Sequence, residues 1–420
     1  MAEKQLNWAG NISYTANYLQ HPTTVEEVQV LVSQCSKIKA LGSRHSFNRI
    51  ADSKEVQVSL QKMKSVVALD TVKHTVTVEG GATYSDIAPY LHAQGYALHN
   101  MASLPHISVV GACATATHGS GVVHGNLGTA VAAMEFVTAS GELLSLAKES
   151  AGEVFSGAVV NLGALGVVTK ITLQLQPAFN MKQVVYQHLP MEELKNKFNE
   201  VIAGGYSVSL FTTWQSKSIN QVWVKSIAEN DNQPPAPGYY GATLAHQHLH
   251  PLEELSAEHT TEQLAIPGTW YDRLPHFRMG FQPSAGKELQ SEYFVALEYG
   301  YDAMMAIEKL HEKISPYLFV SEIRAIAADK LWMSPCYEQA SVAFHFTWKQ
   351  DWEVVKTLLP LIEEVLAPYK PLPHWGKLFT LSPAVLQERV VKLPDFKSLV
   401  HQFDPSGKFR NEFLKTNFYS

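Results

Sequence analysis

The chain has 420 residues, of which 46% are hydrophobic and 17% charged, a composition that can form a substantial core and more than one domain. Its formal net charge of −6 provides no broad basic surface, which argues against nucleic acid or an anionic membrane as a partner. The three cysteines, Cys35, Cys113 and Cys336, are odd in number and far apart, which favours a reducing compartment over a disulfide framework.

The first residues contain no apolar core of signal-peptide length. No apolar run approaches the roughly 20 residues that span a bilayer. We therefore expect a cytoplasmic protein that is neither secreted nor inserted in a membrane.

Helices and strands alternate in the first part of the chain. A helix is predicted to begin at Thr24, where Glu27 completes a capping box and apolar residues follow at helical spacing. A short strand at residues 37–41 leads into GSRHS at residues 42–46, a turn whose small residues leave backbone amides exposed to a ligand. The elements predicted next are strands at residues 66–69 and 75–78 and a helix at residues 85–94. This part of the chain predicts a mixed α+β domain.

Small residues dominate residues 101–128, which do not have the pattern of a packed amphipathic element. Such a backbone can lie flat against a large ligand. Gly119, Gly121 and Gly125 miss the spacing of a dinucleotide-binding fingerprint by one residue, and a predicted strand follows them where that motif needs a helix. The sequence therefore argues against a nicotinamide cofactor held by that motif.

The character of the chain changes near Phe179, after a hairpin with its turn at Gly141. A predicted helix at residues 191–203 then alternates with strands such as 208–214 and 221–225, a pattern typical of helices against an antiparallel sheet. The most loop-like stretch, residues 229–241, lies within this region. These features predict a second domain.

Several segments together carry a resemblance to one family: LGSRHSFN at residues 41–48, PHISVVGACATATHGSG at 105–121, LGALGVVT at 162–169, HWGK at 374–377 and DPSGKFRNEF near the end. The chain resembles the FAD-linked alditol oxidases of the xylitol or sorbitol oxidase type, in the vanillyl-alcohol oxidase and aldonolactone oxidase superfamily. The resemblance implies an α+β, two-domain flavoprotein. Residues 1–180 would form an FAD-binding domain of the vanillyl-alcohol oxidase (PCMH) type, residues 181–374 a substrate domain with an antiparallel sheet flanked by helices, and residues 375–420 a segment returning to the FAD domain.

The same resemblance implies that FAD is bonded covalently to His45 and that the amides of the GSRHS turn surround its pyrophosphate. From spacing alone, a lone histidine in a turn is more often capped or facing solvent. Arg44 departs from the small residue expected beside the linking histidine, although a cation beside a diphosphate is chemically reasonable. The residues implied to bind the cofactor are Leu41, Gly42, Ser43, Arg44, His45, Ser46, Ser103, Ser108, Gly111, Ala112, Thr115, Thr117, His118, Gly119, Gly121 and Val168.

Four further residues are candidates for catalysis. Residues 319–326 alternate, so Glu322 and Arg324 share one face of a strand, where they could simply form an ion pair. His345 lies in another alternating segment, on a predicted neighbouring antiparallel strand where a histidine is usually a core residue. Lys377 lies in PHWGKLF and would otherwise be a surface lysine. The resemblance implies that these four residues converge with Ser108 over the reactive edge of the flavin and bind a polyol.

The implied activity is oxidation of the terminal hydroxyl of an alditol, such as xylitol, sorbitol or glycerol, to the aldose. A hydride passes to flavin N5, and O2 is reduced to H2O2. Arg324 stays protonated, so it would stabilise the developing alkoxide together with Lys377, while Glu322 and His345 bind the next hydroxyls. The sequence leaves open the preferred polyol and whether His345, Lys377 or water takes the alcohol proton.

Two other functions remain as alternatives: an aldonolactone oxidase or dehydrogenase, and a flavin-storing or regulatory binding protein without turnover. A structural metal site at His246, His248 and His250 is a third possibility, but histidines beside a proline-rich loop are more often exposed. The prediction is thus a monomeric enzyme with no metal, acting on a small polyol and O2.

Overall fold

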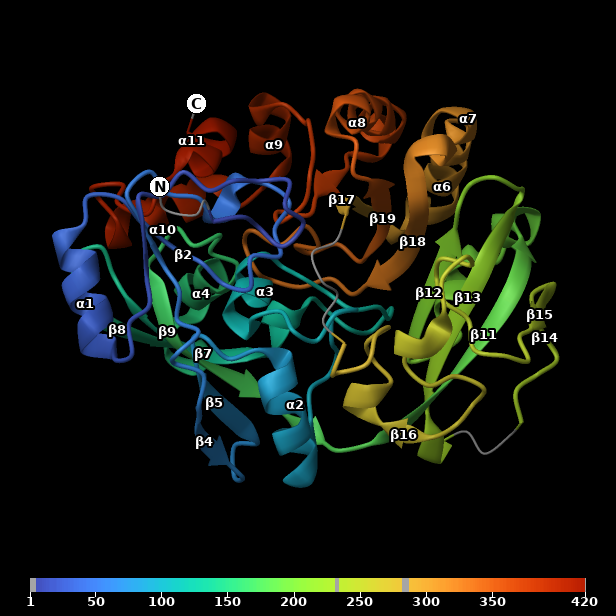
Figure 1. The fold of residues 1–420 in the computed structure, drawn as a ribbon, viewed down its shortest axis with the longest axis horizontal. Helices are drawn as coiled ribbons and strands as arrows, with labels where there is room; N and C mark the ends of the chain where they lie inside the picture. The colour runs from blue at the N-terminus through green and yellow to red at the C-terminus, as the bar shows by residue number, and fades with distance from the viewer. Residues whose placement is uncertain (1–4, 231–233, 282–286, 420) are drawn as a thin grey trace.

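The computed structural model describes residues 5–230, 234–281 and 287–419, and it divides them between two lobes that lie side by side (Figure 1). The first lobe is built on a five-stranded antiparallel sheet of order β4-β5-β9-β7-β8. Its strands are β4 (Val66–Asp70), β5 (Thr75–Glu79), β7 (Val131–Val137), β8 (Leu143–Ala147) and β9 (Val167–Gln174). Gly141 takes a φ of +87° in the turn between β7 and β8, which is the hairpin that the sequence predicts.

A small parallel sheet beside this one delivers the GSRHS turn. Its strands are β1 (Tyr18–Gln20), β3 (Val56–Val58) and β2 (Ile38–Ala40), in that order. Helix α1 (Val25–Gln34) precedes β2 and is capped by Thr24, whose side chain accepts from the Glu27 amide. The Glu27 carboxylate accepts from the amide of Thr23, whereas the predicted capping box would use the amide of Thr24. Because β2 ends at Ala40, the GSRHS turn follows directly at the edge of this sheet.

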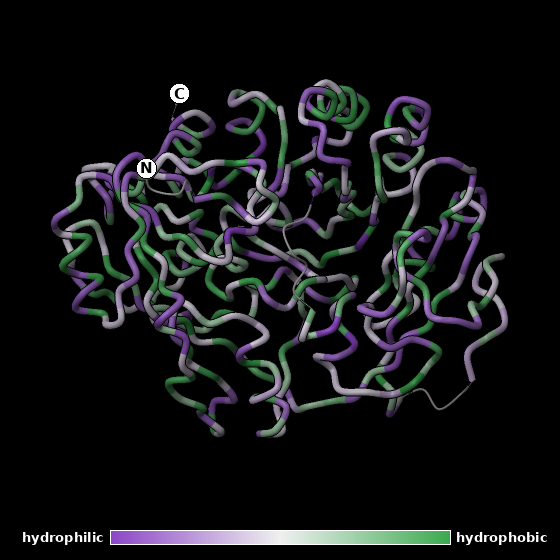
Figure 2. The backbone as a smooth tube through the Cα atoms, viewed as in Figure 1, coloured by the Kyte–Doolittle hydropathy of each residue, from purple (hydrophilic) through white to green (hydrophobic). Residues whose placement is uncertain are grey.

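The second lobe is built on a ten-stranded sheet of order β14-β15-β11-β13-β12-β18-β19-β17-β20, with β16 paired to β11. Its strands are β11 (Asn180–Pro190), β12 (Ser207–Thr212), β13 (Ser218–Ile227), β14 (Gly238–Tyr239), β15 (Ala242–Leu244), β16 (Gly268–Thr269), β17 (Glu288–Ala296), β18 (Leu318–Ile326), β19 (Ser341–Lys349) and β20 (Leu372–Pro373). Helices α6 (Gly300–Glu308) and α8 (Trp352–Leu366) pack against β17, and α6 also contacts β19. Figure 2 shows hydrophobic and hydrophilic residues alternating along α8, whose apolar side is buried against the sheet.

The C-terminal helices lie over the first lobe and share its core (Figure 1). They are α9 (Pro383–Arg389), α10 (Leu393–Phe403) and α11 (Glu412–Phe418). The buried rings of Trp375 and Phe418 meet edge to face at 5.4 Å, and α10 contacts helix α4 (Lys148–Val159) of the first lobe. The end of the chain is therefore packed against its beginning.

Two predicted elements differ from the structure. Residues 191–203 form two short helices, η3 (Met191–Lys195) and α5 (Phe198–Ile202), because Asn196 and Lys197 leave helical dihedral angles. The small-residue run contains a packed helix, α3 (Val109–Ala114), which was not predicted. Alanine is the strongest helix former, and small side chains let this helix sit close to its neighbours.

Other predicted elements are confirmed. Helix α2 (Tyr84–Ala93) ends before Gly95, which takes a φ of +83°. The loop-like residues 229–241 include 231–233, which lie outside the described residues, and β14 lies within the stretch. Within the described parts of the chain, none of the helices combines the length and apolar character needed to cross a bilayer.

Candidate active site

A cavity of about 430 Å³ is lined by residues from both sheets, from the GSRHS turn and from the segment after β20. All four predicted catalytic residues line it: Glu322, Arg324, His345 and Lys377. Of the predicted cofactor residues, those that line it are Leu41, Gly42, Ser43, Arg44, His45, Ser46, Ser103, Ser108, Gly111, Ala112, Thr115, Thr117, His118 and Val168. Its volume and its mixture of apolar walls with a few polar groups are typical of a cofactor or substrate site.

Gly119 and Gly121 do not line this cavity. A Cβ atom at Gly119 would overlap the Asn100 side chain, and one at Gly121 would lie 2.6 Å from the Tyr206 carbonyl oxygen. The Gly121 amide donates to the Ala325 carbonyl at 2.9 Å, which joins the small-residue run to the end of β18. In the structure these two glycines allow close packing within the protein.

The glycines at the cavity itself have a different role. A Cβ atom at Gly42 would overlap Ser108 Oγ, and one at Gly111 would lie 2.6 Å from the same atom. The Ser108 amide donates to Ser43 Oγ at 3.3 Å, so the GSRHS turn and the start of α3 are held together. Because these glycines have no side chains, the cavity wall here consists of backbone and small side chains. Such a wall fits a long, flat cofactor such as FAD.

His45 lies in this wall with one ring nitrogen unused. Its ring centroid is 4.3 Å from that of Trp8 and 5.3 Å from that of His106. Nδ1 is buried and has no hydrogen-bond partner among the described residues. Burial lowers the pKa of His45 to about 3, and His106 and Lys377 add to the effect. The ring is therefore neutral, with a lone pair available to form a bond with an electrophilic carbon, which is the chemistry that a covalent flavin requires.

Arg44 precedes this histidine with a left-handed φ of +61°. The side chain is exposed, and Nη1 donates to Gln5 Oε1 at 3.4 Å. A bulky residue rarely adopts this backbone conformation, which is consistent with the expected preference for a small residue here.

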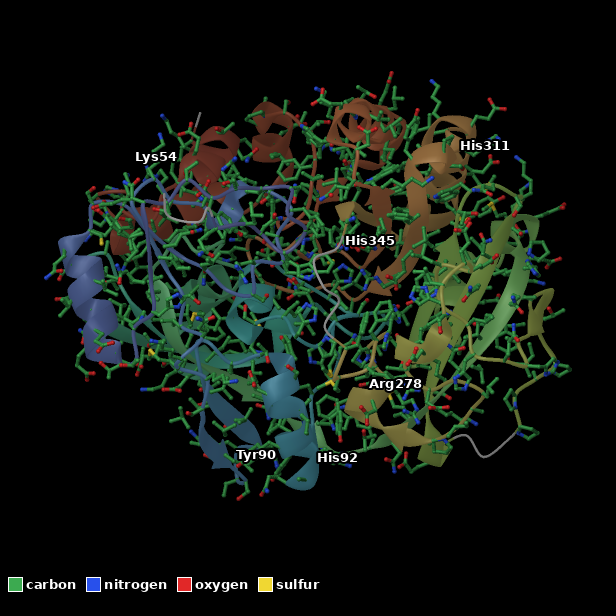
Figure 3. The ribbon with its side chains drawn as sticks, viewed as in Figure 1. Lys54, Tyr90, His92, Arg278, His311 and His345 are labelled. Carbon is green, nitrogen blue, oxygen red and sulfur yellow. The ribbon has the colours of Figure 1, made fainter. Side chains whose placement is uncertain are left out.

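The floor of the cavity is a row of polar residues across three adjacent strands. Glu292 on β17 pairs with His345 on β19, and His345 pairs with Glu322 on β18. Residues directly opposite in antiparallel strands project from the same face, and Arg324 joins them two residues along β18. In Figure 3, His345 lies in the interior of the molecule. The predicted antiparallel pairing of the two alternating segments is therefore confirmed.

Glu292 is a central residue of the site that sequence reasoning missed. It is fully buried and accepts hydrogen bonds from Lys377 Nζ at 2.7 Å and from Arg324 Nη2 at 2.9 Å. His118 Nε2 lies 3.2 Å from Glu292 Oε1. Burial opposes the charge, but Lys377, then His118 and Arg324, hold the pKa of Glu292 well below its usual range. One carboxylate thus anchors both cations of the site.

Lys377 is presented by a short loop that is fixed at both ends. The His374 amide donates to the Glu292 carbonyl and the Leu378 amide to the Gln290 carbonyl, each at 2.9 Å. From the other side, Asn48 Nδ2 donates to the Lys377 carbonyl at 2.7 Å. The ammonium group is therefore positioned by β17 and by the residues just after the GSRHS turn.

The two cations of the site are balanced by two carboxylates. Burial opposes the charge of Arg324, but Glu322 and then Glu292 raise its pKa above the usual range. Burial lowers the pKa of Lys377, and Glu292 opposes this shift. Burial also lowers the pKa of His345 to about 3, and Lys377 adds to this shift. Two cations thus stand beside two carboxylates and a neutral imidazole whose buried Nε2 has no hydrogen-bond partner among the described residues.

Other cavity residues were also not singled out from the sequence, among them His106, Gln290 and His374. The three alternating histidines do not form a metal site: within the described ranges no group of three or more His, Cys, Asp or Glu could hold a metal. His248 Nε2 lies 3.1 Å from Glu262, and His250 Nδ1 accepts from the Leu252 amide, while His246 is exposed. The three cysteines are free thiols.

Comparison with known proteins identifies the cofactor and the family. Residues 16–147 match the family model of the FAD binding domain, and residues 283–417 that of D-arabinono-1,4-lactone oxidase. The chain is 44% identical to an alditol oxidase of Streptomyces sp. over 99% of both chains. It is 28% identical to an L-gulono-1,4-lactone dehydrogenase of Mycobacterium tuberculosis over 97% of both chains.

A cholesterol oxidase from B. sterolicum has a similar structure, with a TM-score of 0.78 at 14% identity over 99% of this chain and 96% of that one. This likeness confirms the predicted α+β, two-domain flavoprotein fold. The identity to the alditol oxidase extends over nearly the whole length of both proteins. This chain therefore belongs to the alditol oxidase family of FAD-dependent oxidoreductases, within the superfamily that includes the aldonolactone oxidases.

Proposed function

We propose that the protein oxidises the terminal hydroxyl of an alditol such as xylitol, sorbitol or glycerol to the aldose, with O2 as electron acceptor and H2O2 as product. The observation that carries this proposal is the convergence of Ser108, Glu322, Arg324, His345 and Lys377 on one cavity. Neutral polyols are bound by directional hydrogen bonds, and this set offers both donors and acceptors.

FAD would occupy the channel between the GSRHS turn and α3, bonded covalently to His45. The buried, unpaired Nδ1 of His45 and the close approach at Gly42 and Gly111 support this placement. The residues that would line the rest of the cofactor are Ser103, Gly111, Ala112, Thr115, Thr117, His118 and Val168. When bound, FAD supplies a hydride acceptor at N5 and transfers the electrons to O2.

The cations act on the substrate oxygen. As the hydride leaves the carbon, negative charge develops on this oxygen, and Arg324 and Lys377 stabilise it because Glu292 holds both in place. Glu322 accepts a hydrogen bond from the next hydroxyl. The low pKa of His345 keeps its imidazole neutral, and we assign the unpaired Nε2 to a hydrogen bond with another hydroxyl.

A second candidate activity is the oxidation of an aldonolactone, which the family-model match at residues 283–417 favours. A panel of xylitol, sorbitol, glycerol and L-gulono-1,4-lactone separates the two. We expect H2O2 production with the polyols and little or none with the lactone. The opposite preference would reject alditol oxidation as the main activity.

We also propose that the chain divides near residues 180 and 374, which agrees with membership of the two large sheets. The ten-stranded sheet begins at Asn180 and ends at Pro373. We further propose that the protein is a monomer of the cytoplasm, which the free thiols support.

Replacing His45 with alanine should abolish covalent attachment of the flavin, because it removes the buried, unpaired Nδ1 that we propose to carry the link. Some non-covalent FAD should still bind, since the backbone of the turn remains. The measurement is the yellow colour of the acid-precipitated protein. A yellow pellet from the variant would assign the link to another residue.

Replacing Glu322 with glutamine should impair polyols more than simple primary alcohols. The carboxylate accepts from a second hydroxyl that simple alcohols lack, so the loss of one charge-assisted hydrogen bond costs about 1.5–3 kcal/mol, or roughly 10- to 100-fold in kcat/KM for xylitol. Comparison of kcat/KM for xylitol and 1-butanol gives the result. Equal losses on both substrates would reduce Glu322 to an ion-pair partner of Arg324.

A further inference from the structure

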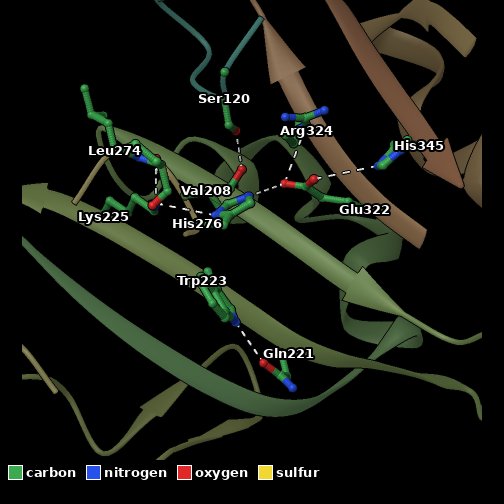
Figure 4. A network of polar contacts seen from close by, with 12 residues as sticks. Ser120, Val208, Gln221, Trp223, Lys225, Leu274, His276, Glu322, Arg324 and His345 are labelled. Atoms are coloured by element: carbon green, nitrogen blue, oxygen red, sulfur yellow. Dashed lines mark hydrogen bonds and ion pairs between the residues drawn. The ribbon is translucent and has the colours of Figure 1, made fainter. Parts of the chain in front are cut away.

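A second layer of polar residues lies behind Glu322. His276 Nε2 is 2.7 Å from Glu322 Oε1, and Figure 4 shows the histidine behind the carboxylate, on the opposite side from His345. His276 is 6% exposed and, like Lys225, does not line the cavity. His276 therefore contacts Glu322 from inside the protein, on the side away from the cavity.

Lys225 on β13 closes this layer. It is fully buried, and Nζ donates to the carbonyls of Arg273, Leu274 and Pro275 at 2.6, 2.6 and 2.9 Å. Nζ also lies 3.5 Å from His276 Nδ1. A buried lysine amine is costly unless it is well paired, and three carbonyls match the three hydrogens of an ammonium group.

This arrangement determines which nitrogen of His276 carries the proton. A hydrogen on Nδ1 would point at Lys225 Nζ, which its contacts with three carbonyls make a hydrogen-bond donor, although burial lowers the pKa of Lys225 well below its usual range. Nδ1 therefore carries no hydrogen, and the ring hydrogen lies on Nε2, where it is donated to Glu322 Oε1. Burial lowers the pKa of His276, which keeps the ring neutral, although Glu322 opposes this shift.

The ring is also held in orientation by aromatic neighbours. The centroid of Phe211 lies 5.4 Å from that of His276 at an interplanar angle of 70°, and that of Trp223 lies 5.3 Å away at 81°. Phe211 on β12 is directly opposite Glu322 on β18 in the sheet. The imidazole therefore meets the carboxylate at a fixed angle.

The two carboxylate oxygens of Glu322 differ in their hydrogen bonds because of His276. Oε1 accepts from His276, whereas Oε2 receives no hydrogen bond from any of the residues that the structure describes, and His345 Nδ1 is 4.0 Å from it. Glu322 itself lines the cavity. One oxygen is thus occupied by the protein and the other is left for the substrate.

We propose that Lys225 and His276 form a positioning relay in which Lys225 fixes the His276 tautomer and His276 holds Glu322 with one oxygen free to accept a polyol hydroxyl. This inference rests on the proposed function, because it concerns how Glu322 recognises its substrate. The relay acts through Glu322 and touches neither substrate nor cofactor. It explains why a lysine and a histidine are buried away from the cavity.

The relay affects the titration of Glu322. Burial raises the pKa of this carboxyl, but Arg324 and then His276 outweigh it and hold the pKa well below the usual range. The titratable and charged groups that face Glu322 are Arg324 on its own strand, His345 on β19, His276 in the loop behind it, Lys225 on β13 and Lys377 beside the cavity. Loss of the His276 donor should therefore raise the pKa of Glu322.

The test compares His276→Gln with His276→Met. Glutamine places an amide donor near the position of Nε2, whereas methionine has a similar volume and no donor. For the methionine variant we expect kcat/KM for xylitol to fall about tenfold, the loss typical of one hydrogen bond to a charged group, and kcat/KM for 1-butanol to change less than about twofold. The acid limb of the xylitol profile should move to higher pH. The glutamine variant should recover most of the activity and the wild-type profile.

Equal losses on the two alcohols, or a methionine variant with wild-type kinetics, would overturn the relay. Glu322→Gln serves as the comparison. If neither Glu322→Gln nor His276→Met changes xylitol oxidation, the proposed function of the site is wrong. If Glu322→Gln impairs xylitol oxidation and His276→Met does not, only the relay is rejected.

The tautomer is tested independently of turnover by 15N NMR of histidine-labelled holoenzyme, with His276→Gln used for assignment. A hydrogen on Nε2 and none on Nδ1 is expected. A hydrogen on Nδ1 would overturn the proposal, even if the methionine variant did not fold.

Discussion

Lys377→Met and Arg324→Leu should each slow reduction of the flavin by xylitol about a hundredfold, or roughly 3 kcal/mol of barrier. Reaction of the reduced enzyme with O2 should change little. Both cations are largely buried and stand beside a buried carboxylate, where a fixed charge stabilises a developing alkoxide strongly.

Anaerobic stopped-flow mixing with xylitol measures the reductive step by itself. Lys356→Met on the outer side of α8 is a matched control, because this exposed lysine pairs with Glu353 at the surface. Its rate should equal that of the wild type. Near-wild-type reduction in both Lys377→Met and Arg324→Leu would remove these residues from the catalytic group.

Replacement of Glu292 should affect both stability and pH dependence. Glu292→Leu leaves Lys377 and part of Arg324 buried without a partner, and breaking a buried ion pair in this way costs about 3–5 kcal/mol. Denaturant unfolding measures the loss. Lys377→Met added to Glu292→Leu should restore part of the stability, because the double variant removes the uncompensated charge. A Glu292→Leu variant as stable as the wild type would show that the anchor is unnecessary.

The pH effect follows from the sign of the shift. Burial lowers the pKa of Lys377 and Glu292 raises it again, so Glu292→Gln should lower it further. If the reductive step needs charged Lys377, its rate is present at low pH and lost as pH rises through that pKa. The alkaline limb of flavin reduction should therefore move to lower pH in Glu292→Gln. Glu298→Gln, an exposed change just after β17, should leave the limb in place.

The sequence predicts those parts of the site that depend on local periodicity. Alternation places Glu322 and Arg324 on one face of a strand, and an alternating neighbour brings His345 beside them, as the register of β18 and β19 confirms. The rest of the cavity depends on segments far apart in the chain. Spacing alone could not bring Lys377 or His45 to it, and only the family resemblance placed them there.

The missed residues had weaker signals. Glu292 is followed by the apolar residues 293–296 of β17, and Lys225 follows the apolar residues 222–224 of β13, so a charge beside an apolar stretch of a strand was the sign that could have revealed each. His276 follows Pro275 in an irregular segment without periodicity, so its contact with Glu322 depends entirely on tertiary structure. The helix α3 was missed because its small residues were interpreted only as a ligand-binding surface.

The loop that carries Lys377 also constrains the order of events during protein synthesis. Asn48 binds the Lys377 carbonyl across 329 residues of chain, and the Phe47 amide donates to the Gly376 carbonyl at 2.7 Å. A nascent chain that already contains His45 outside the ribosome thus lacks this wall of the cavity until Lys377 has emerged as well. Pairings of such long sequence separation form late in folding. The flavin is accordingly enclosed only after residues 374–378 have been synthesised, and a ribosome-stalled chain ending before residue 374 should hold FAD less tightly than the full chain.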